Sequence, residues 1–222
     1  MDFGLSFSFV FKDEEWFKKL AIPALISLIP IIGPLVVSGW GLKIAKNVID
    51  GKKVNALPDV DFGADIGRGF MAFLITAIYS LPAVILSSIS GVLFALTDDS
   101  ANAFSVILFI VGGVLALVVA VLSILIAFMT VAGIANYIAK GEFGAAFNFK
   151  QVFSLIKGSF VSWLLVLLGE IVALGIIAPL GTIICVIGVF LTVVYGTAVY
   201  SHLIGQAYNA SAKPEVEEVV TP

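Results

Sequence analysis

Apolar residues occur along this chain in long runs that contain almost no charge. Leu20–Leu42, Gly69–Thr97 and Ala103–Ala139 carry no charged side chain, and in Gly158–Ala212 the only formal charge is Glu170. A helix needs roughly 20 mostly apolar residues to cross a bilayer, and each of these runs is long enough. The pattern therefore predicts an all-α protein, a polytopic transmembrane helical bundle.

Breakers divide the runs further. The pattern predicts five apolar segments, at residues 16–49, 66–96, 103–139, 152–177 and 180–208. Pro23, Pro30 and Pro34 interrupt the first segment and Pro82 lies in the second. The third has no proline and would be about 55 Å long as one helix, so we expect it to tilt or to extend beyond the cytoplasmic face. Proline and glycine in 178–181 predict a tight helix–helix turn.

The distribution of lysine and arginine predicts the topology, because basic loops stay in the cytoplasm. If the first segment crossed the membrane once, the basic N-terminus and the basic loop 43–68 would face opposite sides. If the chain turns back at Pro30, Gly33 and Pro34, all twelve basic residues lie on one side. We therefore predict four full spans plus an N-terminal re-entrant or short helical hairpin, with both termini cytoplasmic. A single crossing by residues 16–49 is the alternative.

Composition agrees with this class and excludes several others. Of the 222 residues, 60% are hydrophobic and only 12% are charged, whereas soluble domains are about 25% charged. One cysteine and one histidine exclude an internal disulfide and any His/Cys metal site. A net charge of −3 gives no reason to expect nucleic acid. We expect one membrane domain over 1–208, a disordered acidic tail over 209–222, and no cleavable signal in the first 19 residues.

Small residues spaced three or four apart predict the faces on which the helices pack in lipid. The third and fifth segments carry such stripes, formed by Gly113, Ala116, Ala120, Ser123 and Ala127, and by Gly181, Cys185, Gly188, Thr192 and Gly196. The second segment carries Thr76, Ser80, Ala83, Ser87 and Gly91. These stripes favour a compact helical core, and the hydroxyl-bearing one also suits the lining of a solute path.

Glu170 is the candidate functional residue. Carboxylates within a membrane are energetically costly, tend to face the bundle interior, and often mark ion or proton pathways. A purely structural alternative remains open, because a neutral glutamic acid can donate a hydrogen bond to a neighbouring helix.

Other polar residues have simpler interpretations. We expect His202, near the inner end of the last segment, to be interfacial and solvated. Asp59–Asp65 resembles a calcium loop but lacks its closing glutamate. A helix cap by Asp61 or Asp65 explains these residues better. The chain contains no Ser/His/Asp or Cys/His constellation, so we expect no enzyme, no cofactor and no bound metal.

Several short motifs recur in a characteristic order. They are Phe9–Asp13 with Trp16 and Lys18–Lys19, Gly39–Trp40, Lys46–Val48 with Gly51, Leu57–Asp59, Tyr79–Pro82, Phe147–Phe149 with Val152, and His202–Tyr208. With these motifs the chain resembles the prokaryotic membrane family called domain of unknown function 4013 from about Phe3 to Tyr208. Trp40 stands where that family is expected to have tyrosine. The resemblance implies a bacterial or archaeal plasma-membrane protein and assigns no substrate or catalytic residue.

Two functional hypotheses follow. The first is a non-enzymatic membrane protein that associates through its helices with itself or with a membrane-protein partner. The second is a small permease or channel subunit in which Glu170 and the broken first segment serve a solute or ion. A water-accessible cavity that reaches Glu170 would favour transport, whereas a dry bundle with a large apolar groove would favour association.

Overall fold

The computed structural model describes residues 1–97, 102–184 and 186–212, and this part of the chain is helical with no strand. The α-helices are α1 (Phe3–Ser8), α2 (Trp16–Ile26), α3 (Ile32–Ile49), α4 (Phe62–Ala95), α5 (Ala103–Lys140), α6 (Phe149–Gly158), α7 (Phe160–Glu170), α8 (Ala178–Leu180) and α9 (Val186–Ser211). Short 3₁₀ turns occupy Phe9–Lys12, Phe143–Phe147 and Gly181–Ile184, and a π-helix occupies Ile171–Ile177. Four stretches are long and apolar enough to cross a membrane: Phe62–Ala95, Ala103–Lys140, Phe160–Ile183 and Gly188–Ser211. The predicted fold class is confirmed.

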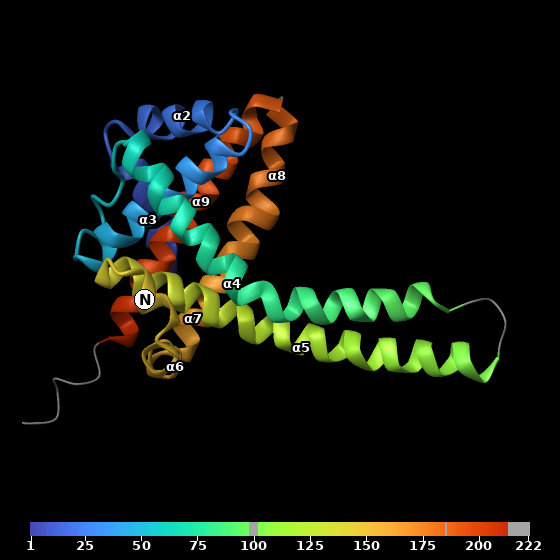
Figure 1. Ribbon diagram of the computed structural model, residues 1–222. Coiled ribbons are helices and arrows are strands. Elements are labelled where there is room, and N and C mark those ends of the chain that lie inside the picture. The colour runs from blue at the N-terminus through green and yellow to red at the C-terminus, as the bar shows by residue number, and fades with distance from the viewer. Residues whose placement is uncertain (98–101, 185, 213–222) are drawn as a thin grey trace, which may run out of the picture.

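The first apolar segment is broken into two helices, as predicted. The chain reverses direction between α2 and α3 (Figure 1) through residues 27–31. Ile31 has φ 67°, a left-handed conformation that is rare for a β-branched residue. A Cβ added to Gly33 would overlap the backbone of Ile26, so the close approach of the two helices requires glycine here. Pro34 lies in the first turn of α3, where its missing N–H has no helical partner to lose.

Helices α4 and α5 form a long hairpin. At 38 residues, α5 is about 57 Å long. The distal part of the hairpin, which comprises α4 after Pro82 and the N-terminal part of α5 packed against it, projects away from the other helices and is called the arm below (Figure 1). Ser90 Oγ donates to the carbonyl of Gly112 at 2.9 Å and ties the two helices of the arm together. The part of α5 that projects from the other helices lies at the end away from Lys140 (Figure 1). That α5 tilts or extends beyond the cytoplasmic face stays a prediction.

The fourth apolar segment is two helices rather than one. The chain breaks at Ser159 (φ −155°, ψ 71°), so α6 and α7 run in different directions (Figure 1). Helix α6 is amphipathic, with Val152 fully buried on one face and Phe153 and Lys157 exposed on the other. The sequence did not indicate this break, because the exposed face of α6 also carries aromatic residues and the apolar run therefore looks continuous.

The expected turn at 178–181 is wrong. Helical structure continues through Pro179 into the 3₁₀ turn at Gly181–Ile184, and α9 begins at Val186. The Ala178 N–H donates to the Ala173 carbonyl, five residues back, and this wide turn precedes the proline. A Cβ on Gly181 would overlap Thr192 Oγ1 of α9, so this glycine serves a close helix contact instead of a turn.

Helix α9 lies at the centre and packs against α1, α3 and α7. The N-terminal aromatic segment, which we expected at the interface, is partly in the core, because Phe9 and Val10 are fully buried. Beside it, Lys19 Nζ donates to Asp13 at 2.7 Å, and this hydrogen bond raises the pKa of Lys19. Helix α9 continues to Ser211, three residues into the expected tail, and residues 213–222 lie outside the described part of the chain.

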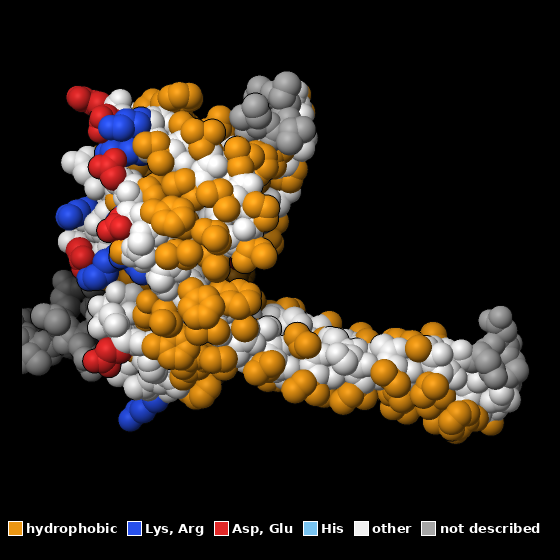
Figure 2. Space-filling view, turned by 45° about the horizontal axis from the view of Figure 1, so that its top comes forward, with side chains coloured by type: hydrophobic (Ala, Val, Ile, Leu, Met, Phe, Trp, Pro, Cys, Tyr) orange, Lys and Arg blue, Asp and Glu red, His pale blue; other side chains and the backbone are white. Residues whose placement is uncertain are grey.

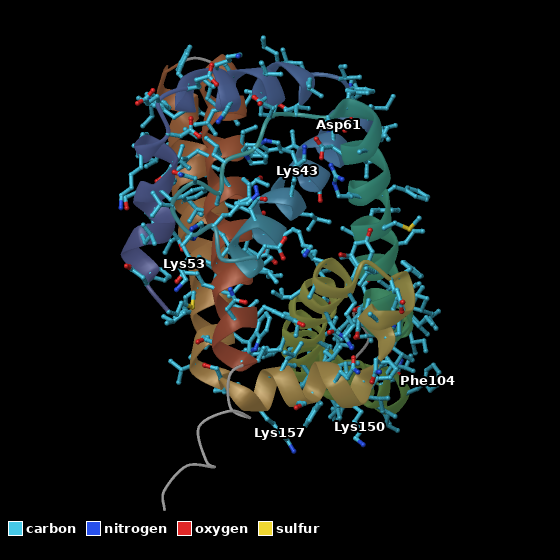
Figure 3. All side chains as sticks on the ribbon, turned by 90° about the vertical axis from the view of Figure 1, so that its left-hand side faces the viewer. Lys43, Lys53, Asp61, Phe104, Lys150 and Lys157 are labelled. Atoms are coloured by element: carbon cyan, nitrogen blue, oxygen red, sulfur yellow. The ribbon has the colours of Figure 1, made fainter. Side chains whose placement is uncertain are left out.

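Charged side chains gather at one end of the molecule, and hydrophobic side chains cover the rest of the visible face (Figure 2). Figure 3 looks onto this end and labels Lys43 of α3, Lys53 of the loop that follows it, and Lys150 and Lys157 of α6. The arm points away from it (Figure 1). The fold therefore has one charged face. Each of the three hairpins, α2–α3, α4–α5 and α7–α9, starts and ends at this face.

Candidate functional site

A cavity of about 830 Å³ lies between α3, α4, α5, α7 and α9. Its walls are mostly aliphatic and aromatic, with Leu35, Phe73, Ile126, Leu174 and Phe190 among them. The base of the arm forms one side and the α7–α9 hairpin forms the other. Figure 1 shows these two limbs diverging, so the cavity occupies the inner corner of an L-shaped molecule.

Hydroxyl groups from several helices border the same cavity. They belong to Ser27, Ser38, Thr76, Ser80, Ser123, Thr130, Thr197, Tyr200 and Ser201. Four of them donate to a carbonyl of their own helix, at 2.8–3.0 Å: Thr76, Ser80, Ser123 and Thr197. The hydroxyl stripe expected along the second segment thus reaches the cavity through Thr76 and Ser80, whereas Ser87 and Gly91 lie farther out, in the arm.

Glu170 lies in the cavity wall, where α7 gives way to the π-helix. Its carboxyl group forms no hydrogen bond and no ion pair with any residue that the structure describes. The residues lining the cavity include no lysine, arginine or histidine. The candidate residue therefore faces a largely apolar space without a counter-charge, and Tyr200 lines the same space.

The residues of the predicted break are only partly in this site. Pro34 lines the cavity together with Ser27 from the preceding turn. Pro30 is exposed within the turn, and Gly33 is buried against Ile26. Pro34 therefore contributes to the edge of the cavity, whereas Pro30 and Gly33 form the turn between α2 and α3.

His202 is fully buried, so the expectation of a solvated histidine is wrong. Its Nε2 lies 2.7 Å from the Lys53 carbonyl, which requires a proton on Nε2, and its Nδ1 accepts from Ser6 Oγ at 2.8 Å. The ring stacks on Phe9 at 4.2 Å. Gln206, one turn later, donates to the backbone carbonyl of Asp2. This polar cluster fastens α1 to α9 and was missed because its partners are about 200 residues apart in sequence.

The acidic stretch before α4 is a helix cap, as predicted. Asp61 accepts from the Ala64 N–H at 3.2 Å, and Asp65 accepts from the Asp61 N–H at 2.7 Å. Asp65 is fully buried and pairs with Arg68 and, at 3.4 Å, with Lys43. Within the described ranges, no three His, Cys, Asp or Glu side chains come together as a metal site.

The recurring sequence motifs meet one another in space. Trp40 Nε1 donates to the Pro58 carbonyl at 2.9 Å, so Trp40 in place of tyrosine still bonds the loop after α3. Tyr79 donates to the Ala146 carbonyl at 2.7 Å and stacks on Phe147. These pairs hold loops onto helices at the charged end of the molecule, and none of them lines the cavity.

The fold and the cavity define a class: a helical membrane-type protein with one carboxyl group in an open cavity between its helices. The family model described as "Protein of unknown function (DUF4013)" matches residues 22–193, and the chain therefore belongs to this family. The predicted family is confirmed, although the motifs at 9–19 and 202–208 lie outside the matched residues. No curated protein and no solved structure matches the chain.

Proposed function

We propose that this protein is a non-enzymatic permease or channel subunit that holds a small solute in the cavity beside Glu170. The observation that carries the proposal is the cavity of about 830 Å³ bordered by an unpaired carboxyl group. Ligand sites typically have volumes of about 300–1,000 Å³ and combine apolar walls with few polar groups. This cavity has that size and character.

The position of Glu170 supports a functional rather than a structural role. A buried carboxyl group kept for structure would donate to a neighbouring carbonyl, and the described part of the chain provides no such bond. Wide π-turns such as Ile171–Ile177 occur frequently at functional sites, because they leave backbone groups without helical partners.

The protein would act in the plasma membrane with its charged end in the cytoplasm. The lipid bilayer would then surround the four apolar helices, and both termini would be cytoplasmic. This orientation is supported by the charged side chains that gather at one end of the molecule (Figure 2) and by the rule that basic segments remain in the cytoplasm.

Ion flux into proteoliposomes tests the proposal. The purified chain is reconstituted with an entrapped pH dye, and a pH gradient is applied with and without a potassium or sodium gradient. We expect flux above protein-free vesicles that falls about tenfold or more in Glu170→Gln, because the acid that carries the proton or cation is lost. Glu142→Gln is the matched control, since Glu142 is exposed outside the cavity. Equal rates for wild type and Glu170→Gln would contradict the proposal.

A second candidate function is helix-mediated association with another copy or with a membrane-protein partner. The arm supports it, because Leu117 and Phe104 are 71% and 67% exposed and Gly113 has open space where a Cβ would lie. Exposed small and apolar positions allow close packing of helices in lipid. Cross-linking from a cysteine at Leu117 in native membranes, with one at Lys157 as control, would detect the contact. Its absence at all protein densities would exclude this role.

A further inference from the structure

We propose that the cavity beside Glu170 takes a hydrophobic organic cation, with an apolar body in the cavity and its positive group against the Glu170 carboxylate. The inference rests on the proposed function, since it names the ligand class of the same site. It is carried by three features: charge, hydrogen-bonding character and size.

The charge of the cavity is unbalanced. Glu170 is the one acidic residue among the lining residues, and no basic residue lies with it. An ionised carboxylate in an apolar surrounding is costly unless it is paired. A bound cation supplies the missing pair, whereas an anionic ligand adds repulsion.

More than half of the hydroxyls that border the cavity are already committed as donors. Five of the nine donate to backbone carbonyls at 2.6–3.0 Å: those of Ser27, Thr76, Ser80, Ser123 and Thr197. Their remaining lone pairs can only accept. A ligand that carries donors or positive charge suits these five groups.

Size and lining argue against a bare metal ion. Hard cations require about six or more oxygen ligands at close range. The cavity offers one carboxylate in a space of about 830 Å³, between apolar walls such as Phe73 and Phe190. A molecule with its own apolar bulk fills this space.

Two ions of one shape test the charge preference directly. Tetraphenylphosphonium and tetraphenylborate are measured by equilibrium dialysis against the full chain in nanodiscs of uncharged lipid, with empty nanodiscs subtracted. We expect the phosphonium to bind at least about tenfold more tightly than the borate. We also expect Glu170→Gln to lose about that factor for the phosphonium, whereas Glu170→Asp and Glu142→Gln keep the binding. Equal binding of both ions, or no effect of Glu170→Gln, would overturn the inference.

A neutral probe separates this inference from the proposed function. If 1-N-phenylnaphthylamine binds and Ala127→Phe, which narrows the cavity, removes it, while the phosphonium shows no preference, the solute cavity stands and the cation class fails. If neither probe binds and the flux assay also shows no activity, both fail. If Glu170→Gln is not monodisperse, Ala127→Phe decides whether the phosphonium occupies the cavity, because this variant changes no charge.

Discussion

Glycine residues set how closely the helices approach. Helices α3 and α4 cross at Gly39 and Gly69, where each glycine lies against the backbone of the other helix: a Cβ on Gly39 would overlap the Asp65 carbonyl, and one on Gly69 would overlap the Leu35 carbonyl. The same crossing keeps Asp65 buried beside Lys43. The α3–α4 wall of the cavity therefore requires glycine at both positions, because any larger side chain would push the two helices apart.

Gly39→Ala should destabilise the protein by about 1–3 kcal/mol or more, because overpacking against backbone has no flexible atom to displace. The measurement is the temperature at which half of the detergent-solubilised protein loses its monodisperse peak. Gly113→Ala is the matched control: its Cβ meets open space, and replacing glycine by alanine in a helix is neutral or favourable. Equal midpoints for the two variants would show that the crossing is not tight.

The His202 cluster is a second feature visible only at the scale of single residues. His202→Ala removes the acceptor of the Ser6 hydroxyl, the donor to the Lys53 carbonyl and the stack on Phe9, whereas Gln206 Nε2 still donates to Ser6 Oγ. Each buried polar group left without a partner costs about 1–3 kcal/mol. We expect faster hydrogen exchange at residues 3–12, with Ser8→Ala as the control, because Ser8 is exposed and its hydroxyl bonds within its own α1 helix. Unchanged exchange in His202→Ala would mean that α1 is held by apolar contacts alone.

At the scale of elements, the apolar runs predict helices well and helix ends poorly. Long charge-free runs require helices in lipid, so α4, α5 and α9 follow from composition. The break at Ser159 and the continuation of helix through Pro179 do not, because a helix end depends on how a segment packs against its neighbours. Pro179 looks like a terminator in sequence, yet the π-turn before it lets the helix continue.

The candidate site was predictable to a similar extent. Glu170 stands out in sequence because it is the single charge in a long apolar run. Its cavity does not stand out, because the lining residues come from five helices and only the fold brings them together. The spacing of Thr76 and Ser80 predicts that they lie on one face of their helix. Only the packing of the other helices shows that this face borders a cavity.

The turn between α2 and α3 stores strain at Ile31. Its positive φ costs a β-branched residue about 1–2 kcal/mol, and its side chain is 81% exposed, so little packing is lost on truncation. Ile31→Gly should therefore raise the thermal midpoint. Ile29→Gly, at a neighbouring exposed position where φ is not positive, should lower it or leave it unchanged. A lower midpoint for Ile31→Gly would mean that this side chain is covered in the membrane.

At the scale of the whole molecule, α5 is longer than the hydrophobic layer that it would cross. An uninterrupted α5 of about 57 Å exceeds a hydrocarbon thickness of about 30 Å. Helices adapt to such excess length by tilting, kinking or locally thickening the bilayer. Helix α4 contains Pro82 and bends before it enters the arm (Figure 1), whereas α5 runs straight. Tilt and local thickening of the bilayer are therefore the responses open to α5.

The predicted topology places both ends of the α2–α3 hairpin on the cytoplasmic side of the membrane, and cysteine labelling tests it. After Cys185→Ser, single cysteines are placed at Lys12, Lys52, Lys150 and Phe104 and are treated with a membrane-impermeant thiol reagent in right-side-out and inside-out vesicles. The first three should react from the same, cytoplasmic side, because the α2–α3 hairpin returns the chain to the face on which it began. Phe104, at the far end of the arm, should react only from the other side or stay protected by lipid. Labelling of positions 12 and 52 from opposite sides would mean that residues 16–49 cross once, and the cavity beside Glu170 would then lack its α3 wall as described.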